Sequence, residues 1–447
     1  MRLAAVLATL LPVTALAQET PNPARLKGDV EKLVGFGTRH TLSSATDPKR
    51  GIGAARRWFG AELTRIGKGC GGCIAVSDVQ RTMSGPRAPG GVNIVDVLGI
   101  QAGSEPDRVI IVQGHIDSRV TDVMNATADA PGANDDASGV ALVLETARLL
   151  SHRKFKATVV YAALSGEEQG LFGGQLLAQT AKERGWKVVA VLNNDIVGNT
   201  LGQNGQRVAT RVRVFSEGIR QADTLAEQLA VRGNGGEDDG PSRALAKAIG
   251  EIGRGIPGGL EVMLDRRPDR FGRGGDHEPF LALGYPAVRF SVGIENYNQQ
   301  HQDLRTKGGV SYGDTVDKMD FPYLAKVTAI NAATIARLAA APAAPAQVTL
   351  NGALGFDTKV TWPEVPGATG YRLHWRRNDR TDWTDHLDVA APASSAMLKG
   401  QIVDDVFVGV SALSADGAES IVTFGGRAGR PPSWQSAPAT PAPAPAR

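Results

Sequence analysis

Val109-Ile110-Ile111-Val112-Gln113-Gly114-His115-Ile116-Asp117 is the stretch from which the architecture of this chain is predicted most directly. Its first four residues form a short, unbroken apolar run, which is typical of a β-strand buried on both faces. An imidazole and a carboxylate follow shortly after the run. The stretch therefore predicts a buried strand whose end carries chemically active side chains.

Similar apolar runs recur on both sides of this strand, and helical patterns lie between some of them. Residues 139–150 form one helix candidate, and residues 48–68 carry apolar side chains at three- and four-residue steps. Strands that alternate with helices predict a three-layer α/β/α fold with a mixed, mostly parallel central sheet. The other runs are residues 92–98, 157–164, 188–192, 212–215 and 287–292.

Acidic and histidine side chains follow three of these predicted strands. His115 follows the first, the pair Glu167-Glu168 follows residues 157–164, and Asp195 follows residues 188–192. In open α/β sheets the ligand crevice lies outside the carboxyl ends of the strands. These residues are therefore expected to converge, although they are far apart in sequence.

Imidazoles and carboxylates gathered in this way can hold two zinc ions, and zinc pairs suit hydrolysis. Asp135 lies in a Gly- and Ala-flanked turn that leads into a helix, and we expect it to bridge the two ions. His115 and Asp195 would complete the ligands of one ion, and Glu168 and His301 those of the other. The predicted cofactor is two Zn²⁺ per chain.

Two further residues receive catalytic roles. Glu167 is predicted to be the general base, because adjacent glutamates cannot easily both bind one metal pair. Asp117 is predicted to accept the second imidazole N–H of His115 and so fix its tautomer. Each motif alone is weak, since Glu167-Glu168 could begin a solvated helix and Asp135-Asp136 could only cap one. Their joint occurrence at strand ends favours a functional site.

The start of the chain predicts export. Arg2 precedes an apolar stretch that ends near Ala15-Leu16-Ala17, so residues 1–17 are predicted to be a cleavable signal peptide of a secreted or periplasmic protein. The alternative is a membrane anchor. This run is too short to span a bilayer, and no later stretch approaches the roughly 20 apolar residues that a span requires.

Composition and charge describe a globular protein of more than one domain. The chain has 447 residues, of which 42% are hydrophobic and 21% are charged. The net charge is only +3, and basic residues are scattered among acidic ones, so nucleic acid is not an expected partner. The two cysteines, Cys70 and Cys73, are predicted to form a local structural disulfide, with a redox pair or a zinc knuckle as alternatives.

A second, smaller domain is predicted beyond an Ala- and Pro-rich linker at residues 339–346. Residues 347–425 contain alternating strands between Pro and Gly turns, which suggest a β-sandwich with a core of aromatic residues. Residues 426–447 are predicted to be a disordered Pro/Ala-rich tail. The domain could contact surfaces or polymers, or only support the first domain.

The first domain, residues 18–338, resembles the di-zinc exopeptidases of metallopeptidase family 28, which include bacterial leucyl aminopeptidases and aminopeptidase Y. The resemblance implies that the predicted ligands bind zinc, that Glu167 is the base, and that the substrates are peptides cut at the N-terminus. The matching motifs are Gly37-Thr38-Arg39-His40-Thr41, Gly114-His115-Ile116-Asp117-Ser118, Pro131-Gly132-Ala133-Asn134-Asp135-Asp136-Ala137-Ser138-Gly139, Gly166-Glu167-Glu168-Gln169-Gly170-Leu171, Asn194-Asp195, Gly275-Asp276-His277-Glu278-Pro279-Phe280, and His301 ahead of Asp314-Thr315-Val316-Asp317.

Several alternatives stay open at this point. His277 competes with His301 as the last ligand, and Asp276 could hold a substrate amine or cap a turn. Residues 198–274 are either a surface excursion or a lid over the cleft. The second domain resembles a fibronectin type III module. The competing functions are a glutaminyl cyclase, which shares this fold but usually works with one zinc, and a binding protein on a peptidase scaffold.

Overall fold

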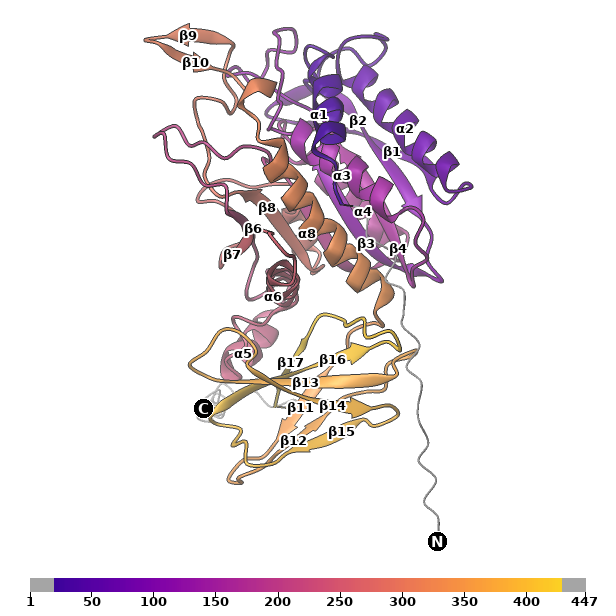
Figure 1. The fold of residues 1–447 in the computed structure, drawn as a ribbon, viewed down its shortest axis with the longest axis vertical. Helices are drawn as coiled ribbons and strands as arrows, with labels where there is room; N and C mark the ends of the chain where they lie inside the picture. Colours follow the sequence, from indigo (N-terminus) through magenta and orange to yellow (C-terminus); the bar gives the residue numbers. More distant parts are fainter. Residues whose placement is uncertain (1–19, 428–447) are drawn as a thin grey trace, which may run out of the picture.

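The structure, a computed structural model, describes residues 20–427 (Figure 1). The predicted signal peptide lies outside the described residues, as does the predicted tail from residue 428 onward. The described part forms an eight-stranded sheet flanked by helices and a separate seven-stranded all-β unit. Within the described residues, no helix combines the length and hydrophobicity needed to cross a membrane.

The eight-stranded sheet has the order β1-β2-β4-β3-β5-β8-β6-β7. Its four middle strands, β4, β3, β5 and β8, run parallel to one another, while β2 and β6 pair antiparallel with the strands at either side of this group. The mixed, mostly parallel sheet that the sequence predicts is therefore confirmed. The strands are β1 (Ala75–Gly85), β2 (Ala88–Gln101), β3 (Glu105–His115), β4 (Ala157–Leu164), β5 (Lys187–Asn194), β6 (Arg211–Phe215), β7 (Glu261–Asp265) and β8 (Ala287–Val292).

Helices cover both faces of this sheet and give three layers (Figure 1). The larger core lies under α1 (Pro23–Val34), α2 (Ile52–Gly69), α3 (Ala137–Leu150), α6 (Pro241–Arg254) and α8 (Phe321–Ala340). A smaller core lies under α4 (Phe172–Glu183) and α7 (Glu278–Ala282) on the opposite face.

Strand β3 explains why the apolar run at 109–112 is unbroken. Ile110 and Val112 belong to the larger core, Val109 and Ile111 belong to the smaller one, and all four are fully buried. A strand that feeds both cores must be apolar at every position. Its last residue, His115, pairs in register with Leu164 at the end of β4, so the active ends of neighbouring strands are level.

Residues 198–274 are part of the main domain and not only a surface excursion. They supply β6 and β7 to the sheet, α6 to one layer, and α5 (Leu225–Gly233) near the second domain. The strands β6 and β7 are short, so their apolar patterns are weaker than those of the central strands. The charged and Gly-rich loops between them therefore make this segment resemble a surface excursion. Residues at the end of this segment line a cleft that is described below.

Cys70 and Cys73 are joined by a disulfide, with 5.6 Å between their Cα atoms. The bridge closes the turn after α2, where Gly71 and Gly72 have φ angles of 74° and 89°. Such angles are readily available only to glycine.

The predicted linker begins later than expected, because α8 extends to Ala340 and Arg108 donates a 2.8 Å hydrogen bond to the carbonyl of Ala341. Alanine has a high helix propensity, so the alanines at the start of the predicted linker continue the helix.

The second unit is a sheet of order β14-β13-β16-β17-β11-β12-β15 around its own core. Trp362 and Tyr371 lie in that core with ring centroids 5.2 Å apart, as the aromatic pattern predicts. The fibronectin type III resemblance stays a prediction. The strands are β11 (Val348–Asn351), β12 (Thr358–Thr361), β13 (Gly370–Arg377), β14 (Asp385–Ala390), β15 (Ser395–Leu398), β16 (Val406–Leu413) and β17 (Thr423–Gly426), and the last of these includes the first residue of the predicted tail.

Buried ion pairs join the two units. Asp239, from the Gly-rich part of residues 198–274, accepts hydrogen bonds of 2.6 and 3.2 Å from Arg376 and one of 2.8 Å from Lys247. The Arg376 guanidinium also lies over the rings of Trp383 and Phe407, at 4.4 and 4.8 Å from their centroids. The second unit is therefore docked on the first through desolvated charges.

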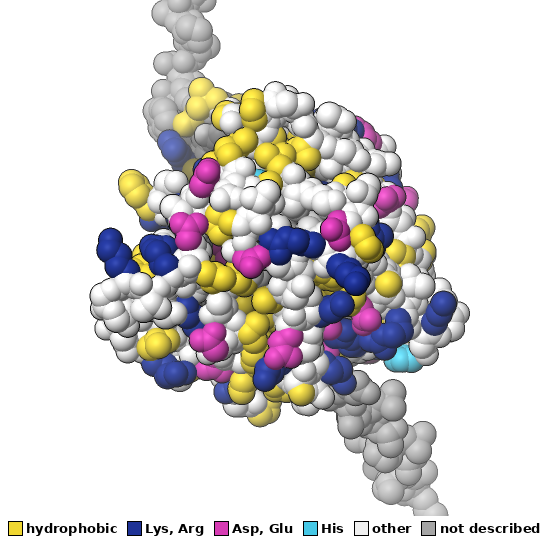
Figure 2. Space-filling model, turned by 90° about the horizontal axis from the view of Figure 1, so that it is seen from above, with side chains coloured by type: hydrophobic (Ala, Val, Ile, Leu, Met, Phe, Trp, Pro, Cys, Tyr) yellow, Lys and Arg dark blue, Asp and Glu magenta, His cyan; other side chains and the backbone are white. Residues whose placement is uncertain are grey.

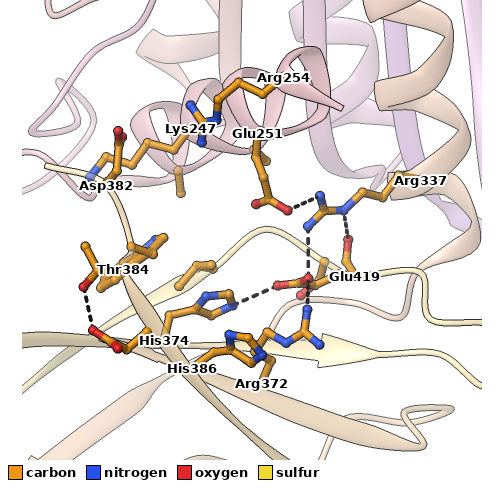
Figure 3. Close-up of a pocket in the computed structure, with 16 residues that line it drawn as sticks. Lys247, Glu251, Arg254, Arg337, Arg372, His374, Asp382, Thr384, His386 and Glu419 are labelled. Atoms are coloured by element: carbon orange, nitrogen blue, oxygen red, sulfur yellow. Dashed lines mark hydrogen bonds and ion pairs between the residues drawn. The ribbon is translucent and has the colours of Figure 1, made fainter. Parts of the chain in front are cut away.

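A second group of charges at this interface centres on Glu419 (Figure 3). Its carboxylate lies 2.8 Å from His374 Nε2 and 3.2 Å from guanidinium nitrogens of Arg337 and Arg372, and Arg337 also pairs with Glu251. Burial opposes ionisation of Glu419, but these partners outweigh it and lower its pKa to about 2. On the outer surface seen in Figure 2, basic and acidic side chains are mostly interspersed.

We predict that Glu419 makes the protein acid-sensitive. A depressed pKa contributes stability that is fully present above the ordinary glutamate value of about 4.3 and is lost as pH falls toward about 2, an effect of about 3 kcal/mol. Between pH 5 and pH 2.5 the urea midpoint of the wild type should therefore fall more steeply than that of Glu419→Gln. The exposed Glu364→Gln variant is the control and should follow the wild type. Parallel curves for wild type and Glu419→Gln would contradict this account.

Candidate metal centre

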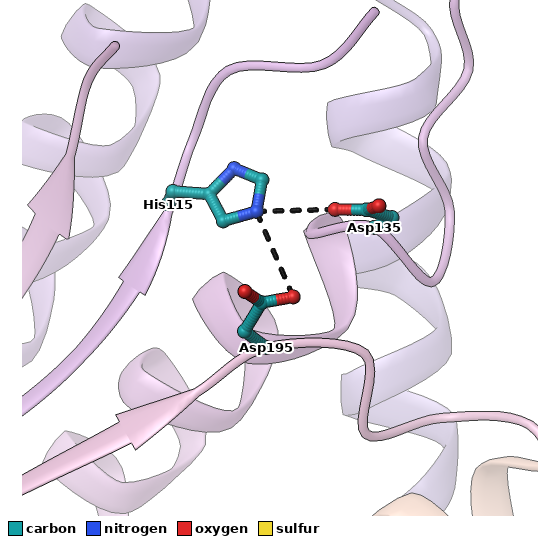
Figure 4. A group of neighbouring side chains, drawn as sticks. All are labelled: His115, Asp135 and Asp195. Carbon is teal, nitrogen blue, oxygen red and sulfur yellow. Dashed lines mark ion pairs between the residues drawn. The ribbon is translucent and has the colours of Figure 1, made fainter. Parts of the chain in front are cut away.

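His115 is the first member of a buried polar cluster at the carboxyl edge of the central sheet (Figure 4). Its Nε2 atom lies 3.1 Å from Asp135 Oδ1 and 3.8 Å from Asp195 Oδ1. The exposed fractions of the three residues are only 2%, 5% and 3%. The imidazole ends β3, Asp195 directly follows β5, and Asp135 precedes α3, so three separate elements supply this first group.

Asp135 also belongs to a second group, with Glu168 and His301. Its Oδ2 atom lies 3.0 Å from His301 Nε2, and the same nitrogen lies 3.0 Å from Glu168 Oε1. Each oxygen of Asp135 therefore faces a different imidazole. The structure brings together all five residues that the sequence predicts as ligands, in the two sets that were predicted.

The alternative ligand His277 lies elsewhere. It is fully buried, and its Nε2 atom lies 2.8 Å from the carbonyl of Pro268 and 3.7 Å from a carboxylate oxygen of Asp269. Asp276 is also buried, and one of its oxygens accepts a hydrogen bond from the Gly174 N–H. Of the two readings of Asp276, the geometry favours the support of a backbone turn.

Two further carboxylates, outside the five clustered residues, accept hydrogen bonds from the backbone around Asp135. Asp314 accepts hydrogen bonds from the backbone N–H groups of Asn134 and Asp135, the latter at 2.7 Å. Asp136 caps α3 by accepting from the Gly139 N–H, and its other oxygen accepts from the His115 N–H at 3.0 Å. These contacts fix the turn on which Asp135 lies. Asp314 and Asp136 both fall within the motifs of the resemblance.

Two arginines brace the outer ligands. Arg289 lies on β8, is fully buried, and places Nη2 2.9 Å from Asp195 Oδ2. Arg119 places Nε 2.7 Å from Glu168 Oε2 and Nη2 2.6 Å from His301 Nδ1. Sequence reasoning missed both residues. An arginine inside a doubly buried strand is an unusual feature, and Arg289 could have been found from that signal alone.

Asp117 lies beneath the Glu167-Glu168 turn. Its carboxylate accepts hydrogen bonds from the Thr41 hydroxyl at 2.7 Å and from the Glu168 N–H at 3.2 Å. The closest acceptor for His115 Nδ1 is the Asp117 backbone carbonyl at 3.1 Å, with the carboxylate at 3.5 Å. Asp117 therefore lies next to His115 Nδ1, as predicted, but its backbone carbonyl is closer than its carboxylate. The carboxylate already accepts hydrogen bonds from Thr41 and from the Glu167-Glu168 turn.

Glu167 lines the cleft above the cluster together with Glu168, Asp135, Asp195 and His301. Burial raises the pKa of Glu167, and the charges of neighbouring carboxylates raise it further against the opposing effect of His115. Its side chain is not one of the five clustered ligands, so it is free to act at the mouth of the site. The general-base role of Glu167 stays a prediction.

The electrostatics of the cluster favour a bound cation. Burial disfavours a charged imidazole, but Glu168 and Asp135 outweigh it and raise the pKa of His301 to about 10. The pKa of His115 is raised as well, by Asp117, Asp135 and Asp195 against the effect of burial. A site that draws protons onto its imidazoles so strongly attracts any cation, and a metal ion competes for the same lone pairs.

The residues also fit zinc by the chemistry of their donor atoms. His115 Nε2 and Glu168 Oε1 are fully buried, yet neither makes a hydrogen bond of suitable geometry, although each has neighbours nearby. Each belongs to one of the two groups whose possible ligand atoms lie within 4.8 Å of one another. Imidazole nitrogen and carboxylate oxygen are common zinc ligands, and three such ligands leave one position open. His115, Asp135 and Asp195 would hold one ion, and Asp135, Glu168 and His301 a second.

Comparison with known proteins relates this chain to metallopeptidases. Residues 96–233 match the sequence model of peptidase family M28. A relative from Pyricularia oryzae, named "Probable zinc metalloprotease", is 43% identical over 416 residues, which cover 90% of this chain and 82% of the relative. The match therefore spans both structural units.

Two solved structures share the fold. The LapA aminopeptidase of Legionella pneumophila is 18% identical, has a TM-score of 0.50, and overlaps 72% of each chain. Glutaminyl cyclase of Porphyromonas gingivalis is 17% identical, also has a TM-score of 0.50, and overlaps 71% of this chain and 99% of its own. At these identities the likeness shows the fold alone. The family resemblance of the first domain is confirmed by the sequence matches: the chain belongs to peptidase family M28 and is a zinc metallopeptidase.

Proposed function

We propose that this protein is an exported aminopeptidase that uses two zinc ions to remove N-terminal residues from peptides. The observation that carries the proposal is the position of Asp135, whose two oxygens face two different imidazoles at 3.1 and 3.0 Å. A carboxylate shared in this way suits a pair of metal ions. The fold itself does not separate the candidates, because an aminopeptidase and a glutaminyl cyclase both have it.

The intact set of five ligands favours the hydrolase over the cyclase, for which one zinc is usual. When bound, zinc would polarise the scissile carbonyl and favour the ionisation of water. Glu167 faces the same cleft as the ligands and would accept the proton of the attacking water, then deliver it to the leaving amine. Arg119 and Arg289 would hold the outer ligands in place through their ion pairs with Glu168 and Asp195.

Export rests on the sequence of residues 1–17. The disulfide between Cys70 and Cys73 supports the proposal, because structural disulfides persist in oxidising compartments. Peptide substrates would then be met outside the cytoplasm. A role of the second unit in contact with surfaces or polymers is part of the same proposal.

The reaction is tested with a matched pair of peptides that differ only at the N-terminus. The purified mature protein should release the first residue of a short peptide with a free amine and should not cleave the acetylated form. A chelator should abolish release, and added zinc should restore it. Equal cleavage of both peptides would reject the aminopeptidase assignment, and conversion of an N-terminal glutamine to a cyclic product without hydrolysis would favour the cyclase.

The role of Glu167 is tested by Glu167→Gln, which keeps the size of the side chain but removes its basicity. Loss of a general base typically costs about 10²–10⁴-fold in rate, so kcat should fall by about that factor. Zinc content, measured by elemental analysis, should match that of the wild type because Glu167 is not among the clustered ligands. Glu183→Gln, on an exposed part of α4, is the control. Wild-type kcat in Glu167→Gln would remove Glu167 from this role.

A further inference from the structure

The cleft above the metal centre has several basic side chains among the residues that line it. It has a volume of about 920 Å³. Four apolar side chains line it, those of Pro86, Leu171, Ile196 and Tyr297. Four arginines line it as well: Arg87, Arg119, Arg270 and Arg273. The chemistry of the walls therefore points to a charged group on the substrate.

Most of the acidic side chains in the same cleft are already committed. Asp135, Glu168 and Asp195 belong to the metal centre, and Glu167 lies beside them. Glu278 is the one further carboxylate among the described residues that line this cleft. The part of the cleft beyond the metal ligands therefore carries more positive than negative side chains.

Arg119 and Arg270 are held by internal partners. Arg119 pairs with Glu168 and contacts His301, and Arg270 pairs with Asp269 at 2.9 Å and with Glu295 at 3.4 Å. These two guanidiniums are committed to ion pairs within the protein. They contribute positive potential, but they are not the best candidates for direct contact with a substrate.

Arg87 is different, because it is placed at the cleft by a single contact. It lies in the turn between β1 and β2, and its Nη1 donates a 2.8 Å hydrogen bond to the backbone carbonyl of Glu168. Among the described residues this is its one hydrogen bond, and its side chain is exposed. A guanidinium offers five N–H donors in a planar fork, so an edge of Arg87 stays available beside the Glu167-Glu168 turn.

Arg273 approaches the cleft from the loop after β7. Its Nη1 lies 2.7 Å from Glu295, but that carboxylate also serves Arg213 at 2.7 Å and Arg270 at 3.4 Å. Three guanidiniums thus share one acceptor. Arg273 Nη2 also donates a 3.3 Å hydrogen bond to the Gln300 side chain. The Arg273 side chain is nevertheless 31% exposed and lines the cleft.

We propose that the cleft selects peptides that carry a carboxylate close to the scissile bond, and that Arg87 and Arg273 are the specificity residues that receive it. The inference rests on the proposed aminopeptidase function. A carboxylate can accept two parallel hydrogen bonds from a guanidinium, which a neutral amide of the same shape cannot match. The carboxylate can be an acidic side chain or the C-terminus of a very short peptide, and both present the same chemistry.

Matched substrates separate these sources. Asp-Ala amide against Asn-Ala amide places the charge on the first side chain, Ala-Glu amide against Ala-Gln amide places it on the second, and Ala-Ala against Ala-Ala amide places it at the C-terminus. The zinc-loaded wild type should prefer the acid of at least one pair by about tenfold or more in kcat/KM, mainly through KM. The pair that shows the preference identifies the position that is recognised.

Variants then assign the preference to residues. Arg87→Gln and Arg273→Gln should each reduce the ratio of the acid kcat/KM to the amide kcat/KM toward one. Arg81→Gln removes the same charge from an exposed position on β1 and should keep the wild-type ratio. A merely structural role of Arg87 would lower the rates for acid and amide alike, and that result would remove Arg87 from the proposal.

The failure of this inference is distinguishable from failure of the proposed function. Equal kcat/KM values within all three pairs overturn the inference while leaving the aminopeptidase intact. If no peptide loses its first residue, the proposed function fails, and calorimetric binding of the same pairs to the zinc-loaded wild type decides the inference instead. Equal affinities for acid and amide would then overturn it, and tighter binding of an acid that Arg87→Gln abolishes would support it.

Discussion

The confinement of five ligand side chains at one buried sheet edge is the constraint on which the rest of this structure depends. Asp135 lies within 3.1 Å of two imidazoles, and these imidazoles in turn meet Asp195 and Glu168. Carboxylates brought together out of water repel one another unless cations balance them. The polar residues around the cluster hold its side chains in place and supply positive charge to it.

The scaffold meets the constraint in two ways. The parallel strands β3, β4 and β5 end at one level, so residues distant in sequence reach a common point without long loops. Buried hydrogen bonds then fix the orientations: Asp314 holds the turn of Asp135, and Arg289 and Arg119 pair with the outer carboxylates. Positive charge continues into the cleft at Arg87 and Arg273, where we infer that it serves selection of substrates.

The sequence predicts the central strands and the five clustered residues well, because both depend on short-range patterns. Residues 157–164 and 287–292 match β4 and β8, since an unbroken apolar run is required of a doubly buried strand. Arg119, Arg289 and Asp314 were not predicted as supports, because their partners are distant in sequence and only tertiary packing brings them together. The docking of Arg376 against Asp239 escaped prediction for the same reason, and an Asp in a Gly-rich acidic stretch resembles a solvated loop.

The central claim is that Asp135 is shared by two metal ions, and metal content tests it most directly. Elemental analysis of the purified protein after equilibration with zinc and gel filtration should give two zinc ions per chain. In Asp135→Asn, which keeps the side-chain volume but removes one anionic ligand, zinc content should fall to one or none, while Asp122→Asn in an exposed loop should keep both. One zinc in the wild type, or two retained in Asp135→Asn, would contradict the account.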